Sequence, residues 1–238
     1  SFWNIFKTFK TTKPTFVVGA GGYVCGPTLL AAYLQGIKVY IIEQNAVMGL
    51  TNRLLSFFSS KIFVHFPKTK GLNERYLEKV RVVGNPTRSV IRPVALKKPG
   101  EKRHVLVFGG SLGAKQINDV IFDLVKNPPF KEIVIHHQTG TDVTAVESAV
   151  EYVGKKYIDD MQSEYEWSDV IISRAGASTV SELAIIKKPV ILFPFPLATD
   201  NHQYYNAKIF QESNDFSTVV LDPQVSGDVA LKEVKEFL

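Results

Sequence analysis

Residues 105–114 read VLVFGGSLGA, and a helical pattern begins at about Lys115. An apolar strand that ends in a glycine-rich turn and continues into a helix is typical of a parallel α/β fold. Val170–Ser173, followed by RAGASTVSE at residues 174–182, repeats the same order. The sequence therefore predicts a doubly wound α/β protein.

Further short apolar runs predict the remaining strands. They are Thr15–Val18, Val39–Ile42, Ile62–Val64, Val80–Val83, Ile133–His136, Lys155–Ile158, Val190–Phe193 and Thr218–Leu221. Residues 84–103 contain three prolines and several basic residues without an apolar period, which is typical of a linker. We expect two Rossmann-like domains, residues 1–87 and 88–238, with a ligand at the carboxyl ends of the strands and in the cleft between the domains.

Composition narrows the class of protein. The chain has 238 residues, of which 45% are apolar and 21% charged, and Cys25 is its one cysteine. These values exclude a disordered chain and a disulfide scaffold, and they favour a reducing compartment. No apolar run approaches the roughly 20 residues of a transmembrane helix. His65, His104, His136 and His137 show no metal-ligand spacing. We expect no metal and no cofactor.

Charge is divided unevenly along the chain. Residues 1–104 contain 17 Lys and Arg against 4 Asp and Glu, whereas residues 105–238 contain 11 against 19. A basic first half is compatible with nucleic acid, an anionic lipid surface or a phosphorylated ligand. The sequence contains no motif that reads nucleic acid, so we expect no nucleic-acid partner.

The first residues of the chain predict an amphipathic helix. Phe2, Ile5, Phe6 and Phe9 fall on one helical face, with Trp3 beside them and lysines at the edge. Such a helix can lie in a lipid interface, with its aromatic rings among the acyl chains and its lysines at anionic headgroups. Packing of the same helix on its own sheet is an equally supported interpretation.

The first glycine-rich loop, GAGGYVCGP at residues 19–27, follows the strand that ends at Val18. Its glycines would let a phosphate approach backbone N–H groups near a helix start. Glu43 lies about 20 residues further on, so a dinucleotide fingerprint is an alternative, although Val24 stands where that fingerprint has its third glycine. A tight turn that requires positive φ is the second alternative.

Two later loops offer the same chemistry. At residues 109–114 and 174–182, glycines and hydroxyls lie between a strand and a helix start, where a phosphate can bind. Glu182 could accept from sugar hydroxyls, or it could close a capping box at the start of its own helix. Residues 194–207, PFPLATDNHQYYNA, offer amides and hydroxyls to a polyol, or helix capping by Asp200 or Asn201.

Taken together, these motifs resemble the MurG family of N-acetylglucosaminyltransferases. They are VVGAGGYV (17–24), EQN (43–45), GLTN (49–52), VGNPTR (83–88), GGS (109–111), HQTG (137–140), IDDM (158–161), RAGA (174–177) and HQYYNA (202–207). The resemblance covers nearly the whole chain in order. It implies a GT-B fold whose first domain is incomplete at its N-terminus. It also implies inverting transfer of N-acetylglucosamine from its UDP derivative to the C4 hydroxyl of lipid I, which gives lipid II in peptidoglycan synthesis.

The resemblance also implies site residues by motif position. The implied donor-binding residues are Asn45, Arg88, Ser111, Tyr157, Ile158, Ala177, Ser178, Thr179, Val180, Ser181, Glu182 and Gln203. Gly19, Gly21, Gly22 and Tyr23 would face the acceptor's pyrophosphate, and Phe2, Trp3, Phe6 and Phe9 would contact the membrane. Within the donor site, Tyr157 would wall the uracil, the Ile158 backbone would bind it, and Glu182 would bind the ribose. Gln203 and Asn45 would contact the sugar. The chain departs from the family at Ile42, Leu112 and Leu197, where the family has His, Gln and His.

The resemblance places the family's general-base histidine before Ser1, so no catalytic residue is expected within these 238 residues. If the molecule begins at Ser1, we expect it to bind the donor without turnover. The expected partners are UDP-N-acetylglucosamine, lipid I, anionic inner-leaflet lipids and other cell-wall synthesis proteins, at the cytoplasmic face of the bacterial inner membrane. Two alternatives remain: a nicotinamide-dependent oxidoreductase that uses Gly19–Gly22 and Glu43, and a non-catalytic, membrane-associated binder of nucleotide sugars.

Overall fold

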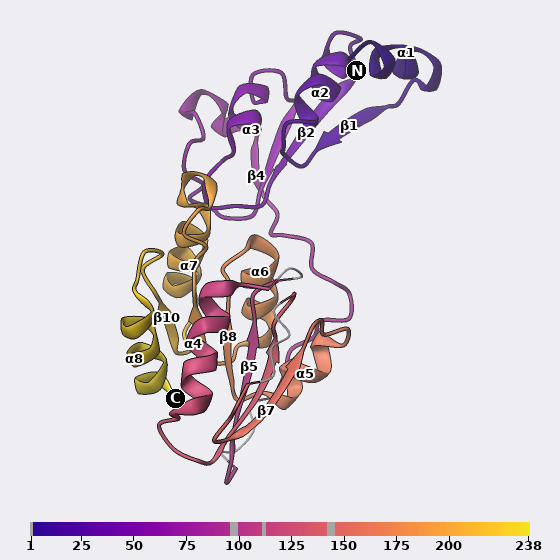
Figure 1. The fold of residues 1–238 in the computed structure, drawn as a ribbon. Coiled ribbons are helices and arrows are strands. Elements are labelled where there is room, and N and C mark those ends of the chain that lie inside the picture. Colours follow the sequence, from indigo (N-terminus) through magenta and orange to yellow (C-terminus); the bar gives the residue numbers. More distant parts are fainter. Residues whose placement is uncertain (1, 96–99, 111–112, 142–145) are drawn as a thin grey trace. The chain divides into compact units, whose positions relative to one another are not determined.

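The computed structural model describes residues 2–95, 100–110, 113–141 and 146–238. Contacts between residues divide the chain into two compact units, Ser1–Pro86 and Thr87–Leu238. Each unit is built on its own parallel sheet with helices packed against it (Figure 1). The division falls one residue before the one expected from the sequence.

The first unit alternates helices and strands around a four-stranded sheet. Its elements are α1 (Phe2–Thr12), β1 (Phe16–Gly19), α2 (Cys25–Tyr33), β2 (Lys38–Glu43), α3 (Leu50–Leu55), β3 (Lys61–Val64), a 3-10 helix η1 (Glu74–Lys79) and β4 (Val80–Val82). The strands are parallel and lie in the order β1-β2-β3-β4. Alternate residues of β2 and β3, including Val39, Ile41 and Ile62, are buried against Leu29 of α2. The period-2 burial of these strands therefore sets which face of the sheet carries the core.

Helix α1 lies alongside α2 and is only partly packed. Phe9 is half-buried against the core of this unit, whereas Trp3 is 68% exposed and forms an aromatic cluster with Phe2 and Phe6. The ammonium of Lys10 lies 5.3 Å from the centre of the Phe6 ring. Phe9, which was expected at the membrane, therefore packs partly inward. The end of the helix that carries Trp3 keeps an aromatic and cationic surface.

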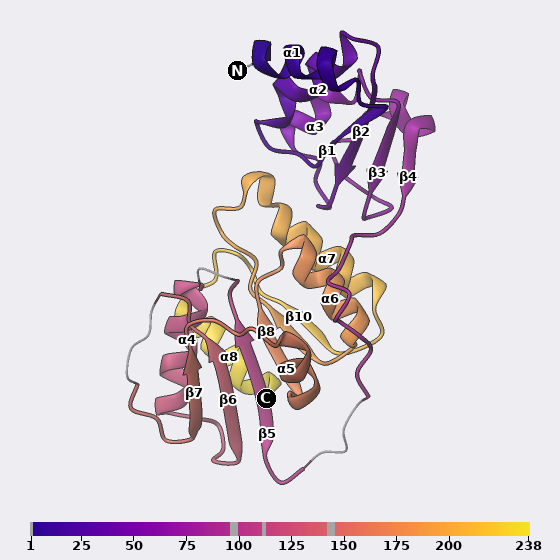
Figure 2. The ribbon, with the colours of Figure 1, turned by 90° about the vertical axis from the view of Figure 1, so that its right-hand side faces the viewer.

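The second unit holds the larger sheet. Its elements are β5 (Arg103–Phe108), α4 (Lys115–Lys126), β6 (Ile133–Gln138), β7 (Glu151–Lys155), α5 (Met161–Trp167), β8 (Val170–Ser173), α6 (Ala177–Ile186), β9 (Val190–Leu192), a 3-10 helix η2 (Thr199–Asn201), α7 (His202–Ser213), β10 (Thr218–Val220) and α8 (Gly227–Phe237). All strands are parallel, in the order β10-β9-β8-β5-β6-β7 (Figure 2). Strands β6 and β7 lie on one side of β5, and β8, β9 and β10 lie on the other side, so the order in which the chain adds strands reverses between β5 and β8. Such a switch point opens a crevice beyond the carboxyl ends of the two strands.

Helices cover both faces of this sheet. On one face α4 and α8 pack together over a core that includes Val105, Ile121, Ile135 and Val234. On the other face lies α5, where Tyr165 packs edge-on against Phe108 of β5. Strands buried on both faces read as continuous apolar runs, and β8 and β9 are buried at every position.

Two predictions about this unit are wrong. The seventh strand was expected at Lys155–Ile158 but spans Glu151–Lys155, because Ile158 is pulled out of the sheet and its backbone N–H donates to the side chain of Gln138. The predicted linker also extends too far, since β5 already begins at Arg103. Its first part is attached to the second unit, where Arg88 contacts Glu182 and the Arg92 N–H donates to Gln162.

Candidate functional site

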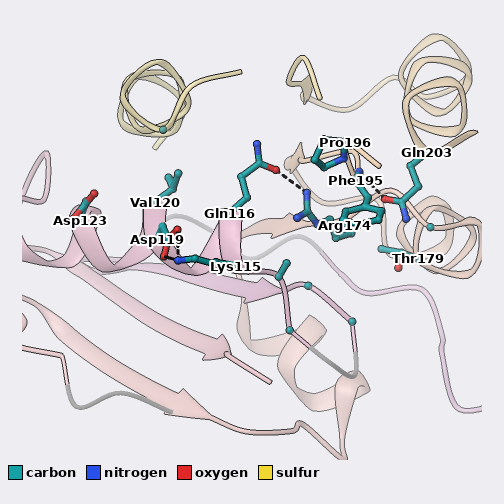
Figure 3. A pocket seen from close by; sticks show the side chains of 16 residues that line it. Lys115, Gln116, Asp119, Val120, Asp123, Arg174, Thr179, Phe195, Pro196 and Gln203 are labelled. Atoms are coloured by element: carbon teal, nitrogen blue, oxygen red, sulfur yellow. Dashed lines mark hydrogen bonds and ion pairs between the residues drawn. The ribbon is translucent and has the colours of Figure 1, made fainter. Parts of the chain in front are cut away.

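A pocket of about 820 Å³ opens in the second unit beyond the carboxyl ends of β5 and β8. It is lined by Gly109, Gly110, Gly113, Ala114, Lys115, Gln116, Asp119, Val120, Asp123, Arg174, Gly176, Thr179, Phe195, Pro196, Gln203 and Gly227 (Figure 3). The pocket therefore lies at the switch point of the sheet, with the starts of α4 and α6 in its wall. Two of the expected donor-binding residues, Thr179 and Gln203, line it.

The loop after β5 needs its glycines. Gly110 and Gly113 have φ values of +94° and +77°, which L-residues rarely adopt. A Cβ atom at Gly113 would lie 2.2 Å from the carbonyl oxygen of Thr139, and one at Gly109 would lie 2.3 Å from the Cβ of Ala114. The glycines thus hold this loop close to the start of α4, whose first N–H groups lack intrahelical partners. The expected donor-binding residue Ser111 lies outside the described residues.

Helix α6 begins differently from the capping box that its sequence allows. Gly176 is the N-cap residue and makes no side-chain cap, and Glu182 does not reach back to the helix start. Thr179 is half-buried in the pocket wall, whereas Val180 is buried in the core and the hydroxyl of Ser181 donates to the carbonyl oxygen of Ala177. Of the expected donor-binding residues Val180 and Ser181, the first therefore has its side chain in the core and the second has its hydroxyl bonded within the helix. Ser178 is exposed at the same helix start.

Glu182 is held by two partners from distant parts of the unit. Its Oε1 accepts from Arg88 Nε at 3.0 Å, and its Oε2 accepts from Arg88 Nη2 at 3.1 Å and from the Tyr165 hydroxyl at 2.9 Å. The hydrogen bond to Glu182 raises the pKa of Arg88, and burial raises the pKa of Tyr165 well above its usual range. A carboxylate offers about four acceptor positions, and these three hydrogen bonds use three of them. Glu182 is itself buried and is not among the residues that line the pocket.

The two residues expected to hold the uracil occupy a short segment after β7. Tyr157 is half-exposed, and the side chain of Ile158 is buried. The N–H of Ile158 donates to Gln138 Oε1 at 2.9 Å. A base that binds this backbone must therefore use the Ile158 carbonyl oxygen or share the N–H with Gln138.

The segment after β9 supplies an amide to the pocket wall. Gln203, in the first turn of α7, accepts from the N–H of Phe195 through Oε1 at 3.0 Å, which leaves its NH2 group free to turn toward a ligand. Asn201 is the N-cap residue of α7 with φ +52° but makes no side-chain cap, so capping of this helix by the Asn201 side chain is wrong. Figure 3 shows Gln203 and Phe195 together on this wall.

Arg174 was not among the expected site residues, although it stands in the loop that leads to α6. Its Nη1 donates to Gln116 Oε1 at 2.9 Å (Figure 3). The same nitrogen also donates to the carbonyl oxygens of Phe193 and Pro194 at 3.1 and 3.3 Å. Burial lowers its pKa to about 10, so the guanidinium keeps its charge at neutral pH. Spacing alone could not identify it, because all three of these hydrogen-bond partners are distant from Arg174 in the sequence.

The glycine-rich loop of the first unit adopts the strained turn. Gly21 and Gly22 have φ values of +88° and +79°, and a Cβ atom at Gly19 would lie 2.5 Å from Leu29. The prediction of a turn that requires positive φ is confirmed. Tyr23 follows as the most exposed large side chain of this loop, at 88%.

The carboxylate of Glu43 accepts hydrogen bonds from residues that follow β2. Its Oε1 accepts from the N–H and the Nδ2 of Asn45, and its Oε2 accepts from the Gly49 N–H at 3.0 Å and from Asn52 Nδ2 at 2.8 Å. All four acceptor positions of this buried carboxylate are filled, so it cannot bind a ribose. The dinucleotide interpretation is therefore wrong. The contacts also fix Asn45, which was expected to meet the donor sugar.

Two features are absent from the residues that the structure describes, a cluster of metal ligands and a membrane-spanning helix. Among those residues, no three or more His, Cys, Asp or Glu side chains gather as a metal site. Within the same ranges, no helix combines the length and the apolar character needed to cross a bilayer.

Two parallel α/β units, with a pocket at the switch point of the second, define the GT-B class of glycosyltransferases. A solved glycosyltransferase of kitacinnamycin shares this fold at a TM-score of 0.71 and 16% identity, over 99% of this chain and 70% of that one. The crystal structure of Acinetobacter baumannii MurG is more similar, with a TM-score of 0.77 and 31% identity over 99% of this chain and 69% of that one.

Sequence comparison gives the family. The glycosyltransferase family 28 N-terminal domain matches residues 1–64, and the family 28 C-terminal domain matches residues 104–233, more than half of the chain. A Syntrophus aciditrophicus protein is 36% identical over all of this chain and 68% of its own length. A Lawsonia intracellularis protein is 41% identical over 85% of this chain and 58% of its own length. Both are named UDP-N-acetylglucosamine–N-acetylmuramyl-(pentapeptide) pyrophosphoryl-undecaprenol N-acetylglucosamine transferase.

The chain belongs to glycosyltransferase family 28, and within it to the MurG family of N-acetylglucosamine transferases. It spans about three fifths to two thirds of the length of these curated relatives.

Proposed function

We propose that the protein takes part in the reaction for which its relatives are named, transfer of N-acetylglucosamine from its UDP derivative to the lipid-linked N-acetylmuramyl-pentapeptide. The observation that carries the proposal is the pocket at the switch point of the second unit, where the starts of α4 and α6 meet. The first N–H groups of each helix, which have no partner within the helix, and the positive end of the helix dipole suit a diphosphate.

In this proposal the second unit binds the donor. The N–H groups at the loop Gly109–Gly113 and at Ala177–Thr179 hold the two phosphates, and they also stabilise the negative charge that develops on UDP as the sugar leaves. The fourth acceptor position of Glu182 takes a ribose hydroxyl, and Tyr157 lies against the base. Gln203 orients the sugar through its free NH2 group. Attack by the acceptor hydroxyl from the opposite side inverts the anomeric carbon. We assign none of these 238 residues as the general base.

The first unit takes the acceptor side in this proposal. Its turn at Gly21 and Gly22 presents backbone N–H groups beside the exposed Tyr23, which suits a pyrophosphate. The surface formed by Phe2, Trp3, Phe6 and Lys10, called here the α1 aromatic surface, suits the headgroup region of an anionic leaflet. This arrangement would place the protein at the inner leaflet of the bacterial membrane, beside other cell-wall synthesis proteins.

Donor binding and transfer are tested separately. Titration calorimetry of this chain with UDP-N-acetylglucosamine is expected to show saturable binding, with UDP competing and ADP not competing. Transfer is measured with a short-chain lipid I analogue on a chimera in which the Syntrophus relative supplies the parts of its length that lie outside the match. We expect a β-linked disaccharide product. A chimera that binds the donor but yields no product would support a non-catalytic binder, and lack of donor binding by the chain would refute the proposal.

A further inference from the structure

The side-chain amide of Gln138 joins two loops that follow different strands. Gln138 is the last residue of β6, and its side chain is buried. Its Nε2 donates to the carbonyl oxygen of Gly110 at 2.8 Å, and its Oε1 accepts from the N–H of Ile158 at 2.9 Å. One end of the amide therefore holds the glycine-rich loop after β5, and the other end holds the segment after β7.

The geometry allows only one orientation of this amide. If it were rotated by 180°, its NH2 group would face the Ile158 N–H, and its oxygen would face the Gly110 carbonyl oxygen. Both interactions would then be repulsive inside a buried site, where an unsatisfied polar group is costly. Glutamine at this position is thus specified by two opposite requirements, a donor toward Gly110 and an acceptor toward Ile158.

The residue after Gln138 fixes the other end of the same glycine-rich loop. Gly113 packs so closely on Thr139 that a Cβ atom would lie 2.2 Å from the Thr139 carbonyl oxygen. That carbonyl oxygen accepts from Asn118 of α4 at 3.0 Å. The end of β6 therefore holds the loop at Gly110 by a side chain and at Gly113 by the backbone. The side chain of Ile158, also buried, anchors the second segment in the core.

We propose that Gln138 is a positioning residue that sets the distance between the phosphate-binding loop and the base-binding segment, so that one uridine diphosphate can contact both at once. This inference rests on the proposed function. A ligand that spans two loops gains from both only when their spacing matches its own length, and preorganising that spacing lowers the cost of binding. Uridine contains the base and the ribose but no phosphate, so it does not reach the phosphate-binding loop and its binding does not depend on this spacing.

The test compares UDP with uridine on this chain. Gln138→Met keeps nearly the same length and volume but removes both hydrogen bonds. We expect its Kd for UDP, measured by calorimetry, to rise about tenfold or more, because two net hydrogen bonds are lost. We expect its Kd for uridine, measured by ligand-observed NMR, to change by less than about threefold. The unfolding midpoint in urea is recorded for each variant.

Gln138→Glu supplies a second, conservative variant. When protonated, its carboxyl group can donate to Gly110 and accept from Ile158 as the amide does, but when ionised it cannot donate. At each pH, the affinity of the variant for UDP is compared with that of the parent chain. We expect the affinity of Gln138→Glu to approach that of the parent as the pH is lowered. The affinity of Gln138→Met should stay below that of the parent at every pH.

Tyr152→Phe is the matched control. It removes one hydrogen bond on the opposite face of β6, where the Tyr152 hydroxyl lies 3.0 Å from His137 Nδ1. This variant should lower the unfolding midpoint while the ratio of UDP to uridine affinity stays unchanged. Equal losses of UDP and uridine affinity in Gln138→Met, or no loss of either, would overturn the role of Gln138 but leave the proposed function standing. Failure of the parent chain to bind UDP would overturn the proposed function together with it.

Discussion

The guanidinium of Arg88 holds the carboxylate of Glu182 through two parallel hydrogen bonds, at 3.0 and 3.1 Å. The two residues are 94 positions apart in the sequence. Arg88 stands two residues beyond the boundary at Pro86, and Glu182 lies in the helix whose start lines the pocket. The pair therefore attaches the segment between the units to the proposed ribose-binding carboxylate.

Glu182→Gln should weaken UDP binding through the ribose. A hydrogen bond to a charged acceptor contributes about 1.5–3 kcal/mol, so loss of the carboxylate should raise the Kd for UDP by about tenfold or more. The Kd for 2′,3′-dideoxyuridine diphosphate should change much less, because that ligand has no hydroxyls to donate. Calorimetry with both ligands measures the difference.

The control for that variant is Glu164→Gln, which alters another buried carboxylate of the same unit. Glu164 contacts His136 and Lys155 rather than the pocket. Its loss should reduce stability and leave the preference for UDP over the dideoxy ligand intact. Equal weakening of both ligands by Glu182→Gln would show that the carboxylate acts only through the fold.

Two glycines of the loop after β5 should respond differently to alanine. Gly110→Ala meets no atom within 4 Å and has only the strain of φ +94° to overcome, about 1–2 kcal/mol. Gly113→Ala meets the Thr139 carbonyl oxygen as well, so the backbone just after β6 must move. Urea unfolding should therefore show a loss for Gly113→Ala at least twice that for Gly110→Ala. Similar losses in the two variants would argue against the close packing of this loop on Thr139.

His137 should make the stability of the chain fall in mild acid. Burial lowers its pKa to about 4, whereas an unfolded histidine titrates at about 6.5. Between these values the unfolded state binds the extra proton, so the free energy of unfolding decreases as the pH falls from about 6.5 to about 4, by at most about 3 kcal/mol. Urea unfolding across this range measures the slope.

His137→Gln removes the titrating group and should flatten that slope. His65, whose pKa burial also lowers, leaves a residual slope of the same sign. Tyr152→Phe retains the imidazole and should keep the dependence on pH although its stability is lower throughout. A His137→Gln variant with an unchanged slope would mean that this ring is not the group that titrates.

The α1 aromatic surface should bind anionic lipid vesicles. Trp3→Ser removes its most exposed ring and should reduce co-sedimentation with phosphatidylglycerol vesicles about tenfold, with added salt weakening the remainder. Val229→Ser removes a half-exposed apolar side chain from α8 in the other unit and should have no effect. Equal binding by all three proteins would contradict the role of this surface.

Local pattern predicted the α/β class and most strands, because parallel strands buried on both faces read as apolar runs such as Val105–Phe108. It failed where a distant side chain competes with local preference. The run EYVGKKYI contains two candidate strands, and the hydrogen bond from Ile158 to Gln138, 20 positions away, excludes the second.

The same competition explains the errors in the site. The spacing of Glu182 from its helix start suits a capping box, but Arg88 and Tyr165 occupy its carboxylate instead. Ser181 and Val180 share a motif with Thr179, yet helical geometry turns only Thr179 toward the pocket. Arg174 and Gln138 stood within the quoted motifs, but their contacts depend on strand order and could not be read from spacing.

The most direct test of the central claim is a crystal of this chain soaked with UDP-N-acetylglucosamine. We expect density for the diphosphate at the starts of α4 and α6, beside Gly110 and Thr179, with a ribose hydroxyl on Glu182. Density for the diphosphate at the Gly19–Gly22 turn, or at any other place away from the pocket of the second unit, would contradict it.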